Sequence, residues 1–268
     1  MLRQYELLKA NPVNIKANGF TVAGSISLLS HYMQSTKSFN KKYFKKLPLG
    51  LLILLILFMA AIFFFAFIMH EVLWEKEDAA DNRVLAFLST NVISDNFTGF
   101  MKGVTSFASA TFLQIAYGAL VLLYVVLKNW KRALEIAAIG IGGFVVNYFM
   151  KLSFHRLRPP NPLIDKLENF SFPSGHATSA FIFYGLLTYL IWKTDIPKLY
   201  KYVIGSILIL FSILIGFSRV YLRVHYPSDV LAGFCIGFAW LLMTVWLFEK
   251  LKKKSDKELN KQTLERKG

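Results

Sequence analysis

The sequence has almost no cysteine and little charge. A single cysteine, Cys235, stands among 268 residues, which excludes an intrachain disulfide and a cysteine-based metal site. Charged residues make up only 18% of the chain, whereas a soluble domain carries about 25%. Hydrophobic residues make up 55%, which excludes the disordered and collagen-like classes.

The charge that is present is mainly positive. Lys and Arg number 31 against 16 Asp and Glu, which gives a formal net charge of +15. A strongly basic protein commonly binds nucleic acid, and its cations then gather on one soluble face. Here the cations stand between long apolar runs, which is typical of a membrane protein with positive cytoplasmic loops. We therefore expect a lipid bilayer, and no nucleic acid, as the partner of this chain.

Six apolar stretches are long enough, or nearly long enough, to cross a bilayer, which needs about 20 residues per helix. They are residues 48–70, 106–127, 132–150, 176–193, 202–217 and 229–248. The first is the clearest, because residues 47–69 contain no charge. The sequence therefore predicts a polytopic membrane protein with about six transmembrane helices.

The distribution of Lys and Arg predicts the orientation of these spans. The segments 1–47, 128–132, 193–201 and 249–268 hold 22 of the 31 cations, and the segments 71–105, 151–175 and 218–228 hold the other nine. The positive-inside rule places both termini in the cytoplasm and the second set of segments outside.

The same counts suggest a division of the chain into three parts. We interpret residues 1–47 as a basic cytoplasmic arm, 48–248 as one six-span domain and 249–268 as a basic cytoplasmic tail. Within the outward segment 71–105, residues 84–103 are apolar at helical spacing. They predict one or two short helices in the outer interface of the membrane.

Three groups of polar residues lie at span ends on the predicted outer face. They are residues 151–159 (KLSFHRLRP), 173–176 (PSGH) and 218–229 (SRVYLRVHYPSD). Lys151, Arg158 and Arg219 have no matching acids close in the sequence, and such cations at a membrane face need an anion such as phosphate. For any one of them alone, snorkelling toward lipid headgroups is the alternative.

Two of the groups also carry residues suited to phosphoryl chemistry. Ser174 is a predicted N-cap, so Gly175 and His176 fall in a first helical turn, where free N–H groups favour an anion. Asp229 falls in the first turn of the sixth span and can bond one ring nitrogen of His225. The other nitrogen is then a nucleophile or base. A plain helix cap explains each group alone, and a metal site lacks an obvious third ligand.

Taken together, the three groups resemble the type 2 phosphatidic acid phosphatase family. The family pattern is Lys, six residues, Arg-Pro; then Pro-Ser-Gly-His; then Ser-Arg, five residues, His, three residues, Asp. The three groups match it in spacing and identity. The likeness covers residues 140–240, and a weaker likeness to the bacterial integral-membrane branch extends back through residues 81–105. With the six spans, it implies an all-α bundle whose site lies at the extracytoplasmic face.

The resemblance implies a role for each residue of the pattern. His225 is expected to form a phosphohistidine, Asp229 to orient it, and His176 to protonate the leaving oxygen and then activate water. The residues expected to hold the phosphate are Lys151, Arg158, Arg219, Ser174 and Gly175. Three fixed cations and a helix N-terminus supply the stabilisation that phosphoryl transfer needs, so we expect no metal and no cofactor.

These roles predict a lipid phosphatase whose substrate places its tail between the spans. An outward site favours recycling of cell-envelope lipid carriers, so undecaprenyl pyrophosphate is the preferred substrate; phosphatidylglycerol phosphate, phosphatidic acid and lipid A phosphate are the others. A phosphotransferase with a lipid or sugar acceptor stays open. A non-catalytic lipid carrier or scaffold is disfavoured by the presence of His225 and Asp229. A soluble vanadium-type haloperoxidase shares the motifs, but the charge-free first span argues against it.

Several residues near the motifs receive no catalytic role. His155, Arg156 and Arg223 stand at unconstrained positions of the pattern, where a contact with a lipid headgroup is one interpretation. Asn147 and Tyr148 stand near the end of the third span. They are interpreted as helix–helix hydrogen-bonding residues rather than the lining of an entrance.

Two glycines in the last span suggest how it packs. Gly233 and Gly237 form a G-x-x-x-G pattern, which is typical of close helix packing in a membrane. Cys235 stands between them and is interpreted as a small apolar packing residue.

Overall fold

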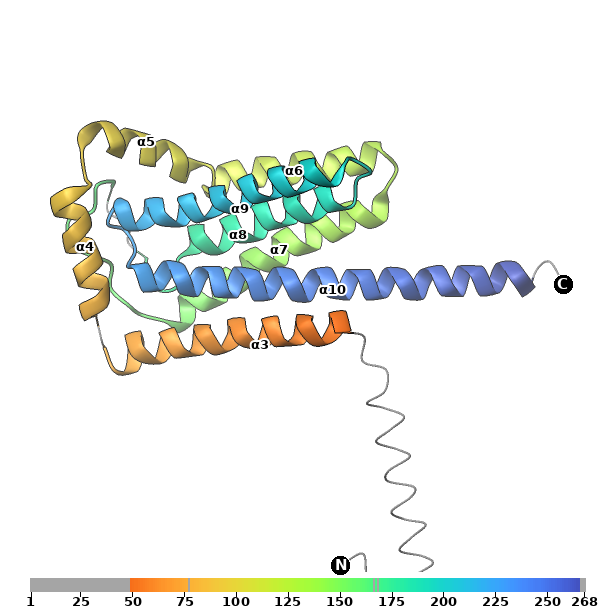
Figure 1. The fold of residues 1–268 in the computed structure, drawn as a ribbon, viewed down its shortest axis with the longest axis horizontal. Helices are drawn as coiled ribbons and strands as arrows, with labels where there is room; N and C mark the ends of the chain where they lie inside the picture. Colours follow the sequence, from red (N-terminus) through yellow and green to blue (C-terminus); the bar gives the residue numbers. More distant parts are fainter. Residues whose placement is uncertain (1–48, 77, 166, 168, 266–268) are drawn as a thin grey trace, which may run out of the picture. The chain divides into compact units, whose positions relative to one another are not determined.

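The computed structural model describes residues 49–76, 78–165, 167 and 169–265, and over these residues the chain forms helices and no strand. In chain order they are α3 (Leu49–Met69), the π-helical turn η1 (His70–Trp74), α4 (Ala79–Asn91), α5 (Asp95–Ser106), α6 (Ala110–Val126), α7 (Trp130–Ser153), α8 (Gly175–Trp192), α9 (Lys198–Tyr221) and α10 (Pro227–Glu265) (Figure 1). The predicted all-α class is confirmed. The predicted arm, residues 1–47, lies outside the described residues.

Each of the six apolar stretches falls on one long helix: α3, α6, α7, α8, α9 or α10. Four described helices are long and apolar enough to cross a membrane, namely α3 continued by η1, α7, α9 and α10. A fifth span results if α5 and α6, which meet at a bend of 41°, are counted as one broken span. Helix α8 is outside this set, so six spans stay a prediction.

Helix α8 is the most enclosed of the long helices. It packs against α7, α9 and α10, and its side chains need not face lipid. Ile182 and Leu186 meet Ile136 and Ile139 of α7 in one buried cluster. A helix covered by protein on several sides can carry small and polar residues that a lipid-facing helix cannot.

The glycine pattern of α10 lies against α8. A Cβ atom at Gly233 would lie 2.7 Å from the carbonyl oxygen of Ser174, and one at Gly237 would lie 2.9 Å from that of Thr178. Only glycine fits at such a distance from another backbone. The close packing that the pattern predicts is therefore confirmed. It brings the first turns of α8 and α10, which carry two of the three motifs, side by side.

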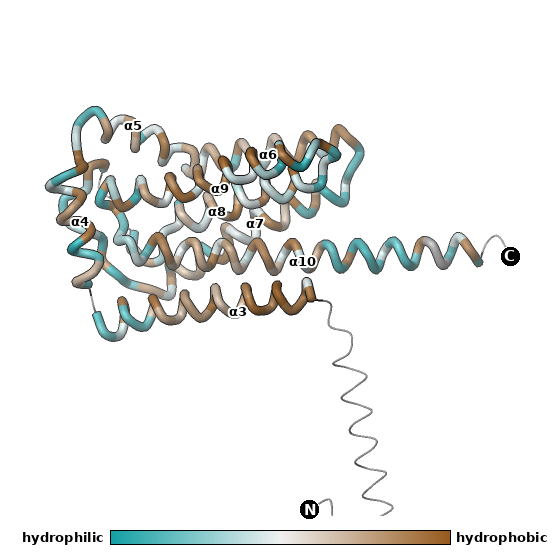
Figure 2. Tube along the Cα trace, viewed as in Figure 1, coloured by the Kyte–Doolittle hydropathy of each residue, from teal (hydrophilic) through white to brown (hydrophobic). Residues whose placement is uncertain are grey.

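Helix α3 is apolar along most of its length, whereas α10 is largely apolar in its first half and mostly polar in its second (Figure 2). Ala61 is the only buried residue in α3, and Phe63 and Met59 are 66% and 61% exposed. A helix that is apolar all round and exposed is suited to a lipid environment. The basic tail from residue 249 continues α10 as a helix to Glu265.

The predicted short helices between the first two spans are α4 and α5. Helix α4 runs across the direction of α9 and α10, near the ends where the motifs lie (Figure 1). The hydroxyl of Tyr221, at the end of α9, lies 3.1 Å from both the backbone nitrogen of Ser94 and the hydroxyl of Thr98. The turn into α5 is thereby fixed to the motif end of the bundle.

Candidate active site

The three motifs meet at one end of the helix bundle. Lys151 lies in the last turn of α7, His176 in the first turn of α8 and Arg219 in the last turn of α9. His225 lies in the turn between α9 and α10, and Asp229 begins α10. The helices run alternately in opposite directions, so these ends come together although the chain separates them by many residues (Figure 1).

His225 and Asp229 form a buried pair. The side chain of His225 is 2% exposed and that of Asp229 is fully buried. The His225 Nδ1 atom lies 3.4 Å from the Asp229 Oδ2 atom. The same oxygen accepts hydrogen bonds from the backbone N–H of Tyr226, at 2.8 Å, and from the hydroxyl of Ser171. Asp229 thus faces one nitrogen of the imidazole and is itself fixed in place.

The other nitrogen of His225 faces a cation. Arg158 Nη1 lies 3.1 Å from His225 Nε2. A guanidinium only donates hydrogen bonds, so Nε2 must be the acceptor, and the ring proton is assigned to Nδ1, toward Asp229. Burial lowers the pKa of His225 to about 3, and the positive charge of Arg158 acts in the same direction while Asp229 opposes it. The imidazole is therefore neutral at neutral pH, and its Nε2 carries a lone pair, which accepts from Arg158, rather than a proton.

The three predicted phosphate-binding cations are held by neutral oxygen atoms. Lys151 Nζ donates to the carbonyl of Phe170 at 2.8 Å, and Arg158 Nε donates to the carbonyl of Asn169 at 2.8 Å. Arg219 donates to the hydroxyl of Thr105 at 2.8 Å, and its buried Nε atom has no hydrogen-bond partner within the part of the chain that the structure describes. None of the three forms an ion pair with a described residue. Burial lowers the pKa of Arg158, although Asp229 opposes this.

The Pro-Ser-Gly-His motif contributes the first turn of α8. Ser174 caps this helix and its hydroxyl accepts from the backbone N–H of Ala177 at 3.4 Å. Ser174 is fully buried and does not line the cavity described below, whereas Gly175 and His176 do. The motif therefore offers the cavity an imidazole and a helix N-terminus.

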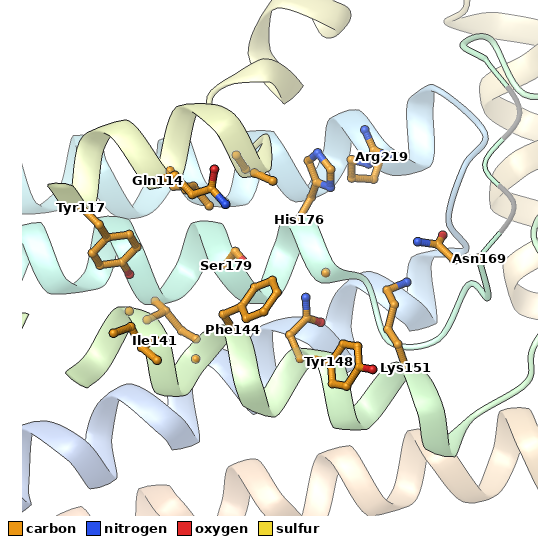
Figure 3. A pocket seen from close by; sticks show the side chains of 18 of the residues that line it. Gln114, Tyr117, Ile141, Phe144, Tyr148, Lys151, Asn169, His176, Ser179 and Arg219 are labelled. Atoms are coloured by element: carbon orange, nitrogen blue, oxygen red, sulfur yellow. The ribbon is translucent and has the colours of Figure 1, made fainter. Parts of the chain in front are cut away.

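A cavity of about 760 Å³ connects these groups with the space between α6, α7 and α8. Lys151, His176 and Arg219 gather at one end, and Tyr117 and Ile141 line the opposite end (Figure 3). Apolar side chains make up most of the wall away from the cations. The cavity thus joins a strongly positive end to an apolar channel, which suits a phosphate attached to a hydrocarbon chain.

Polar residues without charge lie between the two ends of this cavity. Gln114 and Ser179 stand between the cations and Tyr117 (Figure 3). Asn147 and Tyr148 also line the cavity, and the buried Asn147 Oδ1 atom has no hydrogen-bond partner among the described residues. Our interpretation of Asn147 and Tyr148 as helix–helix hydrogen-bonding residues was therefore wrong, because both face the cavity.

Four residues near the site lie outside the family pattern as we read it. Ser171 binds Asp229, and Thr105 binds Arg219. Arg156 is 9% exposed and donates to Asp229 Oδ1 and to Asp81 Oδ2, each at 2.7 Å. Asp81 and Thr105 belong to the segment whose weaker likeness was noted. Arg156 points inward, which contradicts its interpretation as a headgroup contact.

The described residues hold no group of three or more His, Cys, Asp or Glu side chains placed to bind a metal ion. Three carboxylates, those of Asp78, Asp81 and Asp229, each form an ion pair with the guanidinium of Arg156. Independence from metal ions stays a prediction, and a chelator tests it.

The comparison of sequences gives a family and several similar proteins. The model of the PAP2 superfamily matches residues 132–253. Phosphatidylglycerophosphatase B of Bacillus subtilis is 33% identical over 162 residues, which cover 57% of this chain and 76% of that protein. Undecaprenyl-diphosphatase BcrC of Bacillus subtilis is 33% identical over 133 residues, which cover 46% of this chain and 63% of that protein.

The comparison of structures agrees. The crystal structure of a transmembrane PAP2-type phosphatidylglycerolphosphate phosphatase from Bacillus subtilis superimposes with a TM-score of 0.64 and 26% sequence identity. The match covers 72% of this chain and 96% of the solved one. The helices that carry the motifs are thus arranged as in a solved membrane phosphatase.

Proposed function

Because this chain belongs to the PAP2 superfamily, we propose that it is a membrane lipid phosphatase that acts through a phosphohistidine. One observation carries the proposal. Three cations without ion-pair partners and two imidazoles face one end of a cavity whose remainder is apolar. A dianionic phosphate on a lipid satisfies both ends of such a cavity, whereas a lipid without phosphate leaves the cations unpaired.

In the first step, His225 attacks the phosphorus atom. The Nε2 lone pair forms the N–P bond while the bond from phosphorus to the leaving oxygen breaks. His176 enters this step as an imidazolium beside the phosphate dianion and donates a proton to the leaving oxygen, so the lipid leaves as a neutral alcohol or as a protonated phosphate. Asp229 holds the Nδ1 proton and stabilises the positive charge that the ring gains, as the acid of a triad does.

In the second step, water removes the phosphoryl group. The leaving group has taken the proton of His176, whose neutral ring now accepts a proton from water. The water oxygen bonds to phosphorus, the N–P bond breaks, and His225 returns to its neutral form. The products are the dephosphorylated lipid and inorganic phosphate.

The cations stabilise the charge that develops on the phosphoryl oxygens. Arg158 donates to the same His225 lone pair that must attack phosphorus, so substrate has to displace this hydrogen bond. The phosphate supplies the displaced guanidinium with new acceptors, and Lys151 and Arg219 bind the other oxygens. The Gly175 N–H is the further contact that we propose, whereas Ser174, expected to bind the phosphate, is buried away from the cavity and caps α8.

The apolar part of the cavity accommodates the hydrocarbon tail. The similar proteins carry the names of phosphatases for phosphatidylglycerophosphate, undecaprenyl diphosphate and lipid A. We keep undecaprenyl pyrophosphate as the preferred substrate, because the proposed site faces outward. Purified protein in detergent, assayed against these three lipids and phosphatidic acid, identifies the headgroup by the highest kcat/KM.

The substitution His225→Ala tests the mechanism. It should abolish phosphate release and the acid-labile phosphoenzyme that rapid quenching traps, while the thermal unfolding midpoint stays near that of the wild type. His70→Ala is the control, since His70 is an exposed imidazole of η1 and should leave turnover unchanged. Near-normal turnover in His225→Ala would rule out the phosphohistidine.

A further inference from the structure

Arg156 lies among three carboxylates, of which those of Asp229 and Asp81 are buried and that of Asp78 is partly exposed. Its Nη1 donates to Asp229 Oδ1 at 2.7 Å, and its Nη2 donates to Asp81 Oδ2 at 2.7 Å and to Asp78. The guanidinium carbon lies 4.0 Å from the centre of the Tyr226 ring. The side chain of Arg156 is 7% exposed, so this is an internal structure and not a surface ion pair.

The two oxygens of Asp229 have different partners. Oδ2 faces Nδ1 of His225 and accepts from Ser171 and the Tyr226 N–H, whereas Oδ1 faces Arg156 alone. A carboxylate bound on one oxygen only can rotate about its Cβ–Cγ bond. With Arg156 on the second oxygen, that rotation is blocked, and Oδ2 stays directed toward the imidazole.

We propose that Arg156 is a positioning residue that fixes Asp229 against His225, and that α4 holds Arg156 in place through Asp81 and Asp78. The inference rests on the proposed function, since it concerns the same nucleophile. Arg156 does not line the cavity and so acts on the reaction through Asp229.

Asp81 connects this arrangement to both α4 and α10. Its Oδ1 accepts from the backbone N–H of Ser228 at 3.0 Å, and its Oδ2 accepts from the Ser228 hydroxyl and from Arg156. Ser228 precedes Asp229, so a single α4 carboxylate holds both the guanidinium and the first turn of α10. The segment between the first two apolar helices is thereby a part of the site's support.

The chemistry of the arrangement favours arginine over lysine. A planar guanidinium donates from two nitrogens in fixed directions, so it can bind Asp229 on one side and the α4 carboxylates on the other. Burial lowers the pKa of Arg156, but the charges of Asp229, Asp81 and Asp78 outweigh burial and raise the pKa above its usual value. The side chain therefore stays charged throughout the working pH range.

The test compares Arg156→Gln and Arg156→Lys with Arg132→Gln. Arg132 is a matched control: it is a partly buried arginine bound to Glu135 and to Tyr189 at 2.9 Å, at the opposite end of α7 from Lys151. Arg156→Gln should lower kcat about 10- to 100-fold with KM changed less than about threefold. Arg156→Lys should recover part of the loss. Arg132→Gln should lower the unfolding midpoint but leave kcat unchanged.

The tautomer of His225 gives a readout that stability alone does not move. In the wild type, ¹⁵N NMR should show the proton on Nδ1, and in Arg156→Gln it should show a mixture of tautomers. The proposal is overturned if Arg156→Gln leaves kcat unchanged, changes KM alone, or leaves the tautomer of His225 unchanged. If Arg156→Gln does not fold, Asp81→Asn tests the proposal instead. This substitution keeps the shape of the side chain that holds Arg156 and removes its charge, so it should lower kcat in the same way.

Failure of this inference is distinguishable from failure of the proposed function. If the wild type releases phosphate and His225→Ala does not, while the Arg156 and Asp81 variants keep the wild-type kcat, only the positioning role is wrong. If the wild type releases no phosphate from any lipid of the panel, the phosphatase itself is wrong.

Discussion

At the scale of single residues, the site keeps two kinds of cation apart. Arg156 is surrounded by carboxylates, whereas Lys151, Arg158 and Arg219 donate to carbonyl or hydroxyl oxygens. A neutral oxygen orients a cation without cancelling its charge. The three cations therefore still attract a phosphate dianion, whereas the charge of Arg156 is already neutralised by the carboxylates around it.

The contact between Thr105 and Arg219 makes this orientation testable. Thr105→Val preserves shape but removes the hydroxyl that accepts from Arg219. Loss of a hydrogen bond to a charged group costs about 1.5–3 kcal/mol, so the Ki for inorganic phosphate should rise by about 10- to 150-fold. Thr90→Val is the control, since the exposed Thr90 hydroxyl bonds only within its own helix. An unchanged Ki would show that Arg219 needs no such support.

The burial of His225 predicts how the charge of its ring depends on pH. A free histidine gains its proton as the pH falls through about 6.5, but burial lowers the pKa of His225 to about 3. The ring should therefore stay neutral from about pH 8 down to about pH 5, and ¹⁵N NMR of histidine-labelled protein should show this. The His225→Gln spectrum assigns the signal. A midpoint near 6.5 would mean that the ring is exposed to water.

The sequence predicted the residues that face the cavity better than those that support them. The motif spacing singled out His225, His176 and the cations without any structure. Ser171 and Arg156 contact Asp229 across 58 and 73 positions of the chain. Local pattern contains no information about such a contact, because it forms only when the loop after α7 folds over the start of α10.

At the scale of elements, the contact between α8 and α10 determines how two motifs meet. Ser174 donates its backbone N–H to the carbonyl of Asp229 at 2.9 Å. This bond joins the first turns of the two helices, and Gly233 and Gly237 allow the close approach behind it. The position of His176 relative to His225 therefore depends on helix packing as well as on the local turns.

Alanine at the two glycines should separate stability from activity. Gly233→Ala places a methyl group 2.7 Å from the Ser174 carbonyl, directly behind the site, and Gly237→Ala places one 2.9 Å from the Thr178 carbonyl, one turn deeper. Each should cost about 1–3 kcal/mol of stability through overpacking. Only Gly233→Ala should also lower kcat, because it displaces the first turn of α8. Equal kcat in both variants would contradict this.

A third glycine gives the matched control for that pair. A Cβ atom at Gly103, in α5, meets no atom within 4 Å. Gly103→Ala should therefore leave kcat unchanged and raise the unfolding midpoint slightly, since alanine favours a helix over glycine. A midpoint measured for all three variants by the same thermal scan separates helix propensity from packing.

At the scale of the whole molecule, hydropathy predicted which segments are helices but not how many of these helices cross the membrane. All six apolar stretches are helical, yet α8, which other helices cover, is not among the four described helices that are long and apolar enough to cross a membrane. The course of α4 across the bundle was not predictable, since it depends on the contacts of Asp81 and Tyr221 with distant residues. Burial and long-range contacts, not local pattern, decide both features.

The orientation in the membrane can be tested by cysteine labelling, because only one native cysteine, Cys235, has to be removed first. In a Cys235→Ser background, Lys102→Cys marks the segment predicted to lie outside, and Lys131→Cys and Lys257→Cys mark segments predicted to lie in the cytoplasm. All three lysines are exposed. In intact cells an impermeant maleimide should label only Lys102→Cys, and all three should react after the membrane is opened.

This orientation decides which substrates can reach the site. Lys102 lies in α5, whose Thr105 contacts Arg219 in the wall of the cavity, so labelling at residue 102 reports the side on which the cavity opens. If Lys102→Cys is protected in intact cells and Lys257→Cys reacts, the positive-inside reading is reversed. The cavity would then face the cytoplasm, and the preference for an undecaprenyl carrier on the outer face would lose its basis.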